Sequence, residues 1–210
     1  MTLPNAVLFP GTLLPLYIFE ERYRRMLADC LKNDRMFAVG LARSDGEGPC
    51  AIAGVGLVQA CVGQADGTSH LALRGLVRVR VKHFKEAHPV LDYPVATVEP
   101  VRITGEGHKL NREVVVERVR RLARVRARLG AKIPKDVVDS LVALENAELF
   151  LDMVGYTMLD NWQEKQLVLE ALDVNERLAQ LLALLHKEIE RVELWKSLQG
   201  KLPNRNVGNN

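Results

Sequence analysis

The sequence lacks the short motifs that mark many catalytic sites. It contains no Gly-x-Ser-x-Gly turn, no Gly-x-x-x-x-Gly-Lys-Ser/Thr phosphate loop, no Gly-x-Gly-x-x-Gly and no His-Glu-x-x-His. The glycine pairs at 54/56 and 105/107 lack the third glycine of a nucleotide-binding turn. His186 and Glu190 have ligand-like spacing on a helix, but a zinc site needs three or four ligands. We therefore expect no catalytic residue, no cofactor and no metal, and an enzyme acting on small molecules would rest on generic pockets alone.

Cysteine pairs and aromatic residues are also scarce. The chain of 210 residues has three cysteines, and none of them forms a Cys-x-x-Cys pair. An odd, unpaired set favours reduced thiols in a cytoplasmic compartment. Aromatic residues make up 5% of the chain, which leaves few side chains on which nucleic acid bases could stack.

Residues 3–19 contain no charged side chain, yet they lack the marks of a leader or an anchor. A secretory signal has a basic stretch before its apolar run, and only two residues precede Leu3. A membrane-spanning helix needs about 20 uninterrupted apolar residues, and this segment is broken by Pro4, Pro10 and Pro15. We therefore expect the segment to be part of a buried core, with no membrane association.

The first half of the chain has the pattern of short strands. We expect buried strands at residues 6–9 and 13–19, joined by a turn at residues 10–11, and then a helix at residues 20–32. Further strands are predicted at residues 36–42, 51–62, 70–73, 77–84 and 95–101, separated by turn-forming residues. Gly54 and Gly56 inside the long strand indicate a bend or bulge. These features favour a compact, barrel-like sheet with one early helix.

The second half has the pattern of helices. Helices are predicted at residues 111–130, from residue 134 onward with a break near Asn146, at residues 162–172, and then to residue 198. Asn111 and Gly130 suit the two ends of the first, and Asp173 and Glu176 form a capping box before the last. We therefore predict an α+β chain, with a strand-rich subdomain at 1–106, a helical bundle at 107–200 and a flexible tail at 201–210.

Two basic features stand out against a net charge of +3. Residues 112–128 hold seven arginines against two glutamates, a local charge of +5, so the rest of the chain carries −2. In residues 77–82 valines alternate with cations, which predicts an outward row of positive charge on a strand. Together they define a candidate nucleic acid patch, although solvated helix and strand faces are the more common explanation. Its residues are Arg78, Arg80, Lys82, Arg118, Arg120, Arg121 and Arg124.

Four stretches carry a resemblance to a known family. They are LPNAVLFPGTLLPLYIFEERYRRM at 3–26, FAVGLARSDGEG at 37–48, GVGLVQACVGQADGTSHLALRGLVRVRV at 54–81 and QEKQLVLEALDVNERLAQLL at 163–182. In this order they resemble the N-terminal domain of the Lon ATP-dependent protease family, especially its stand-alone members. The residues that carry the signature are Pro15, Phe19, Glu20, Arg22, Tyr23, Gly75 and Arg78, together with Asp173, Glu176 and Arg177.

The resemblance implies a PUA-like, curved β pseudo-barrel followed by an α-helical bundle. It also implies recognition of polypeptide substrates, with ATP hydrolysis and peptide cleavage in later domains. Those domains have no counterpart in this sequence: it has no Walker motif, and the segment from Pro134 resembles the start of the family's serine motif but lacks the serine.

The leading hypothesis is therefore a non-catalytic module that recognises unfolded or extended polypeptide. It would act as an adaptor in protein quality control, beside a separate ATP-dependent protease or chaperone. The groove between the two halves is the expected binding site, and the signature residues are expected to be mainly structural. The alternative is a nucleic-acid-binding protein that uses the arginine-rich helix.

Overall fold

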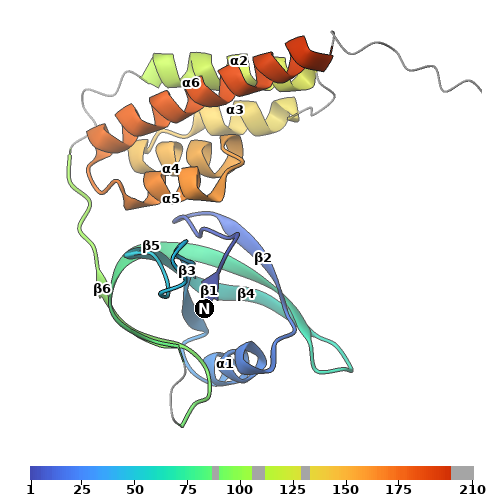
Figure 1. Cartoon of the computed structure of the whole chain (residues 1–210), viewed down its shortest axis with the longest axis vertical. Coiled ribbons are helices and arrows are strands. Elements are labelled where there is room, and N and C mark those ends of the chain that lie inside the picture. Colours follow the sequence, from blue (N-terminus) through green and yellow to red (C-terminus); the bar gives the residue numbers. More distant parts are fainter. Residues whose placement is uncertain (87–89, 106–111, 129–132, 200–210) are drawn as a thin grey trace, which may run out of the picture.

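The chain folds into a curved sheet on one side and a stack of helices on the other (Figure 1). The computed structural model describes residues 1–86, 90–105, 112–128 and 133–199. The strand-rich half comprises β1 (Thr2–Leu3), β2 (Leu13–Ile18), α1 (Glu21–Lys32), β3 (Met36–Leu41), β4 (Ile52–Gly63), β5 (Ser69–Lys85) and β6 (Val95–Pro100). The helical half comprises α2 (Arg112–Ala127), α3 (Lys135–Ala143), α4 (Ala147–Met158), α5 (Trp162–Glu170) and α6 (Val174–Gln199).

The sheet is built around the long antiparallel hairpin of β4 and β5. The strand order is β1-β3-β4-β5-β2, and β6 pairs with the second half of β5. Register shifts at Val55/Gly56 and at Val58/Ala60 bend the hairpin, as the glycines in β4 predict. The predicted α+β class is confirmed, and the six described strands form a curved sheet that does not close.

One predicted strand is wrong. Residues 6–9 are all buried, but they form no strand and instead cross the face of the β4–β5 hairpin. The crossing is so close that a Cβ atom at Gly54 would lie 2.1 Å from the carbonyl oxygen of Leu8, and one at Gly75 would lie 2.0 Å from that of Phe9. Only glycine leaves room for main chain at these two positions. An apolar run of four residues cannot distinguish a strand from such a crossing segment.

A second difference concerns the strands predicted at residues 70–73 and 77–84, which form the single strand β5. Gly75 pairs with Gly56 and Val77 with Val55, so Leu76 is an extra residue that bulges out of the ladder. With this bulge, β5 continues as one strand past Gly75, the glycine that leaves room for the crossing segment.

The helix predictions are largely confirmed. The helix predicted at residues 20–32 is α1, and the break near Asn146 separates α3 from α4. The side chain of Asn146 accepts a hydrogen bond from Leu149 N (2.8 Å) and caps α4. The caps predicted at Asn111 and Gly130, the boundary at 106/107 and the tail at 201–210 lie outside the described residues. None of the described helices is long and apolar enough to cross a membrane.

Two hydrophobic cores hold the structure together. One lies inside the sheet beneath α1, and the other lies between the sheet and the helices. The crossing segment (residues 6–9) contributes to both, because Ala6 and Leu8 enter the first core whereas Val7 and Phe9 enter the second. The two halves are therefore joined through shared buried side chains.

The close approach at Gly75 gives a testable expectation. The substitution Gly75→Ala should lower the free energy of unfolding by about 1–3 kcal/mol, because the added methyl group must displace the main chain at Phe9. Gly63→Ala is the matched control, since its new Cβ would lie no nearer than 4.0 Å to the Ser69 hydroxyl. Chemical denaturation measures both, and equal effects of the two substitutions would contradict the close packing at Gly75.

Candidate functional site

Strand β2 is apolar on both of its faces. Leu14 and Ile18 point into the core beneath α1, whereas Leu13, Pro15 and Tyr17 alternate with them on the outside. Leu13 and Tyr17 are each 49% exposed. The outward residues of an antiparallel strand are usually polar, so an apolar outward row that remains exposed is a candidate interaction surface.

The exposed row continues across the neighbouring strands. Tyr17 pairs with His70 of β5, and their rings stack with centroids 4.6 Å apart. The ring of Phe19, just after β2, also stacks on that of Tyr17, with centroids 5.7 Å apart. Ala60, Val62 and Ala72 extend the surface and line, with Tyr17 and His70, a shallow hollow of about 330 Å³. We call this surface the outer apolar face: Leu13, Pro15, Phe19, Tyr17, Ala60, Val62, His70 and Ala72.

Strand β2 also lies at an end of the sheet. It pairs with β5 on one side, and no described strand pairs with its other side. Pro15 fits this position, because proline cannot donate to a ladder and is tolerated mainly in edge strands. At one end of β2 the hydroxyl of Tyr156 in α4 donates to the carbonyl oxygen of Leu13 (3.1 Å), which fixes the strand against the helices.

The charged signature residues near β2 begin helix α1. The carboxylate of Glu20 accepts a hydrogen bond from Arg22 Nε (2.9 Å), and Arg22 lies over the ring of Tyr23 at 4.6 Å. Tyr23 is only 4% exposed, and its hydroxyl donates to the carbonyl oxygen of Thr2 (3.1 Å). Burial raises the pKa of the Tyr23 phenol. Tyr23 therefore anchors α1 to the sheet, whereas Phe19 stays on the surface.

Two signature arginines meet at one buried carboxylate. Arg78 from β5 forms two hydrogen bonds to Asp152 of α4 (2.8 and 2.5 Å), and Arg177 from α6 forms a third (3.1 Å). All three side chains are at most 3% exposed. Arg78 Nε also donates to the carbonyl oxygen of Leu169, and Arg177 Nε to that of Ala171. Burial lowers the pKa of Arg177, and the charge of Asp152 opposes that shift.

The other signature residues, Gly75, Asp173 and Glu176, make contacts that stabilise the fold. Gly75 permits the crossing described above, and Asp173 caps α6 by accepting hydrogen bonds from the N–H groups of Asn175 (2.8 Å) and Glu176 (3.2 Å). These bonds lower the pKa of the Asp173 carboxyl. The Asp173 half of the predicted capping box is therefore present, and Glu176 takes part in it through its main-chain N–H.

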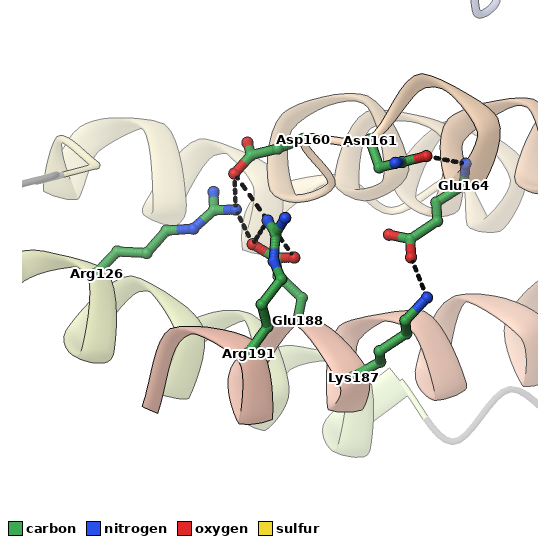
Figure 2. Close-up of polar contacts among 7 residues, drawn as sticks. All are labelled: Arg126, Asp160, Asn161, Glu164, Lys187, Glu188 and Arg191. Atoms are coloured by element: carbon green, nitrogen blue, oxygen red, sulfur yellow. Dashed lines mark hydrogen bonds and ion pairs between the residues drawn. The ribbon is translucent and has the colours of Figure 1, made fainter. Parts of the chain in front are cut away.

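The arginine-rich helix α2 places one of its cations, Arg126, inside the bundle (Figure 2). Arg126 is 8% exposed and binds both Asp160 and Glu188 at 2.6 Å. Glu188 also accepts from Arg191 (2.7 Å), and hydrogen bonds from both arginines outweigh the effect of burial and lower its pKa. Close by, Asn161 caps α5 and Lys187 pairs with Glu164. This network ties α2 and α6 to the start of α5.

The predicted nucleic acid patch is not gathered on one surface. The outward row predicted at residues 78–82 is wrong for Arg78, because helix α4 covers that part of the sheet and buries the side chain. Arg80 and Lys82 remain exposed, and Lys82 pairs with Glu99. Figure 1 places α2 on the side of the helical half away from the sheet, with α4 and α5 between them. On α2, Arg120 and Arg124 are exposed, Arg121 pairs with Glu193 (3.0 Å), and Arg118 is partly buried.

The junction between the two halves, which we expected to hold the binding groove, is mostly filled. The core that lies between sheet and helices occupies it, and a cavity of about 230 Å³ remains beside Arg78 and Asp152. That volume is below the usual range of ligand pockets. Among the described residues no group of three or more His, Cys, Asp and Glu could hold a metal ion. His186 and Glu190 do approach each other on α6, at 3.3 Å on its surface.

Sequence analysis missed Asp152 and most of the outer apolar face. Asp152 is the one charged residue in an otherwise apolar stretch, FLDMVG, which is a signal for a buried charge that needs a partner. His70 and Val62 carry no motif at all. The apolar outward row of β2 was visible in the alternation of Leu13, Pro15 and Tyr17.

Comparison with known proteins identifies relatives of the whole arrangement. Residues 1–187 match the family model of the ATP-dependent protease La (LON) substrate-binding domain. The Lon protease of Dictyoglomus thermophilum is 25% identical over 97% of this chain, and that of Vibrio parahaemolyticus is 26% identical over 96%. In both cases the chain spans 26% of the relative's length.

Solved structures show the same fold. The N-terminal domain of a Lon protease from the Mycobacterium avium complex superimposes with a TM-score of 0.68 at 19% identity, covering 89% of this chain and 96% of that domain. A Lon N-terminal domain protein from Xanthomonas campestris has a TM-score of 0.59 at 24% identity, covering 87% of this chain and 95% of its own.

The buried cluster around Asp152 should be sensitive to the loss of its carboxylate. Asp152→Asn would leave two buried arginines without the carboxylate that both of them bind, so we expect the free energy of unfolding to fall by about 3–5 kcal/mol. Glu193→Gln, which removes an exposed partner of Arg121, should cost at most about 1 kcal/mol. Denaturant unfolding compares the two, and a small effect at Asp152 would show that the arginines do not depend on it.

The pKa of Glu188 predicts how stability changes in acid. Because its pKa is lowered below the ordinary value of 4.5 on folding, ionised Glu188 stabilises the fold at neutral pH. This contribution should be complete above pH 4.5 and should disappear as the pH falls through the lower folded pKa. The difference in unfolding free energy between the native chain and Glu188→Gln, measured from pH 7 down to about pH 3, should therefore shrink in acid. A difference that does not change with pH would contradict it.

Proposed function

The chain belongs to the LON substrate-binding domain family, and from this membership we propose that it binds extended, unfolded segments of other polypeptides through its outer apolar face. The exposed apolar row of β2 is the main observation that supports this binding site. Leu13 and Tyr17 are half exposed, and Phe19 beside them is 59% exposed. Unfolded chains differ from folded proteins chiefly in the apolar side chains that they expose, so an apolar surface distinguishes them.

The edge of β2 supports an extended conformation for the bound segment. A polypeptide that lies along this edge beyond Pro15, away from the Tyr156 hydroxyl that binds Leu13, could add a short strand to the sheet, and its main-chain hydrogen bonds would supply affinity with little demand on sequence. Alternate side chains of such a segment would point to the same side as Tyr17 and Pro15. The shallow hollow between β2, β5 and β4 would receive one of them.

The composition of the outer apolar face predicts weak dependence on salt. Its eight residues include no lysine, arginine, aspartate or glutamate, and the exposed Arg74, which pairs with Leu13, borders the face at one end. Binding driven by apolar burial is not screened by ions, whereas binding to phosphates weakens steeply as salt rises. Salt dependence therefore separates this proposal from the nucleic acid alternative.

We also propose that the chain presents polypeptides to a partner and catalyses no reaction itself. The relatives that it matches are about four times its length, and they are named for an ATP-dependent protease activity. The described residues contain the part of such a protein that corresponds to its N-terminal domain. A separate ATP-dependent protease or chaperone would then act on the polypeptide that this chain holds.

A parallel titration tests the proposal. Labelled unfolded polypeptide and labelled single-stranded RNA are each titrated with the protein at low and at physiological salt, and binding is followed by fluorescence anisotropy. We expect saturable polypeptide binding that survives salt. Tyr17→Ser combined with Val62→Ser should weaken it at least about tenfold, because exposed aromatic anchors contribute most of the affinity of such surfaces.

The control removes equally exposed apolar side chains elsewhere. Leu194 and Trp195 at the end of α6 are 61% and 60% exposed, so Leu194→Ser with Trp195→Ser matches the loss of apolar surface. This variant should bind polypeptide as the native chain does. If both double variants weaken binding equally, the outer apolar face is not the site. Salt-sensitive binding of RNA alone, abolished by Arg120→Glu with Arg124→Glu, would replace the proposal with the alternative.

A further inference from the structure

A larger cavity lies where the curved sheet fails to close. Strand β6 pairs with β5 and strand β1 pairs with β3, and the described strands make no ladder between β6 and the β1–β3 side. The gap opens into a cavity of about 450 Å³ floored by β4 and bordered by α1. This volume falls within the usual range for small-molecule pockets.

The wall of this cavity is mainly apolar and adaptable. Three methionine side chains, Met1, Met26 and Met36, contribute to it, together with the rings of Phe84 and Tyr93. Methionine is unbranched and polarisable, so it fits ligands of varied shape. The cavity shares no residue with the hollow of the outer apolar face, and the two are therefore separate sites.

The polar groups of the wall favour a positive charge. Asp29 and Asp34 both line the cavity, whereas no lysine, arginine or histidine among the described residues does. The Tyr93 hydroxyl donates to Asp29 Oδ2 (3.1 Å) and holds that carboxylate at the rim. The amino group of Met1 also lies at the wall, where it donates to the carbonyl oxygen of Ala38 (2.8 Å), and burial lowers its pKa to about 6. Asp29 and Asp34 are therefore the charged side chains of the described wall, and the charges of Arg22 and Arg35 act on Met1 and Cys30 from outside it.

We propose that this cavity binds a small apolar molecule that carries a cationic amine. The apolar part would lie against the methionine and phenylalanine side chains, and the ammonium group would lie at the rim beside Asp29 and Asp34. The rings of Phe84 and Tyr93 add to the preference, because aromatic faces attract cations. A carboxylate ligand of the same shape would meet two like charges and is disfavoured.

Methionine methyl signals provide a site-resolved test. The protein is labelled at its methionine methyl carbons and titrated with decylammonium, decanol and decanoate, each below its aggregation threshold, and NMR spectra are recorded. We expect saturable shifts at Met1, Met26 and Met36 with decylammonium, while Met153 and Met158 of α4 stay unchanged as internal controls. Decanoate should bind at least about tenfold more weakly than decylammonium.

Variants separate the charge preference from the apolar cavity. Asp29→Asn with Asp34→Asn should remove most of the preference for decylammonium over decanol, whereas Asp139→Asn on the exposed side of α3 should leave it unchanged. Ala96→Trp should fill the cavity and abolish binding of all three probes, and the unchanged signals of Met153 and Met158 would confirm that the variant is folded. Equal affinity for decylammonium and decanoate, or shifts that spread to α4, would overturn the proposal.

Discussion

The structure depends on the buried carboxylate of Asp152, which holds two arginines from different elements. Arg78 comes from the sheet and Arg177 from α6, so three distant parts of the chain converge on one side chain of α4. Buried charges are tolerated only when they are paired and hydrogen-bonded. Each guanidinium group pairs with Asp152 and donates from Nε to a carbonyl oxygen, whereas Arg177 Nη2 is buried without a hydrogen-bond partner among the described residues. The geometry fixes where the helices sit on the sheet. It also determines which part of the outer sheet surface they leave uncovered.

That uncovered part lies on β2 and its neighbours, and its character follows from the same constraint. The helices cover the sheet at Arg78, and α4 reaches only one end of β2 through Tyr156. The remaining outward residues of β2 are as apolar as core residues, although they are exposed to solvent. The sheet thus has one surface buried within the molecule and a second that is suited to burial by another molecule. The opening between β6 and β1 adds a different, acidic environment on the same small sheet.

Much of this arrangement could be predicted from the sequence where the signal is local. The spacing of apolar residues predicted β2 and α1, and a capping residue predicted the start of α6. These features depend on residues that are neighbours in the sequence. The prediction failed where the burial of a residue depends on contacts with distant segments of the chain. Alternation placed Arg78 correctly on the outer side of β5, but no local pattern reveals that α4 covers it. The two basic features are both positively charged, but the structure does not bring them together on one surface. The outer apolar face was only partly visible, because it joins strands through pairings such as Tyr17 with His70 that the sequence does not specify.

The crossing segment at residues 6–9 links the packing of the two halves. Its successive side chains alternate between the two cores, so neither core can loosen without disturbing the other. A molecule that binds the folded sheet therefore stabilises the helical half as well, by the same free energy that binding contributes. Four residues without regular secondary structure thus connect the packing of the two halves.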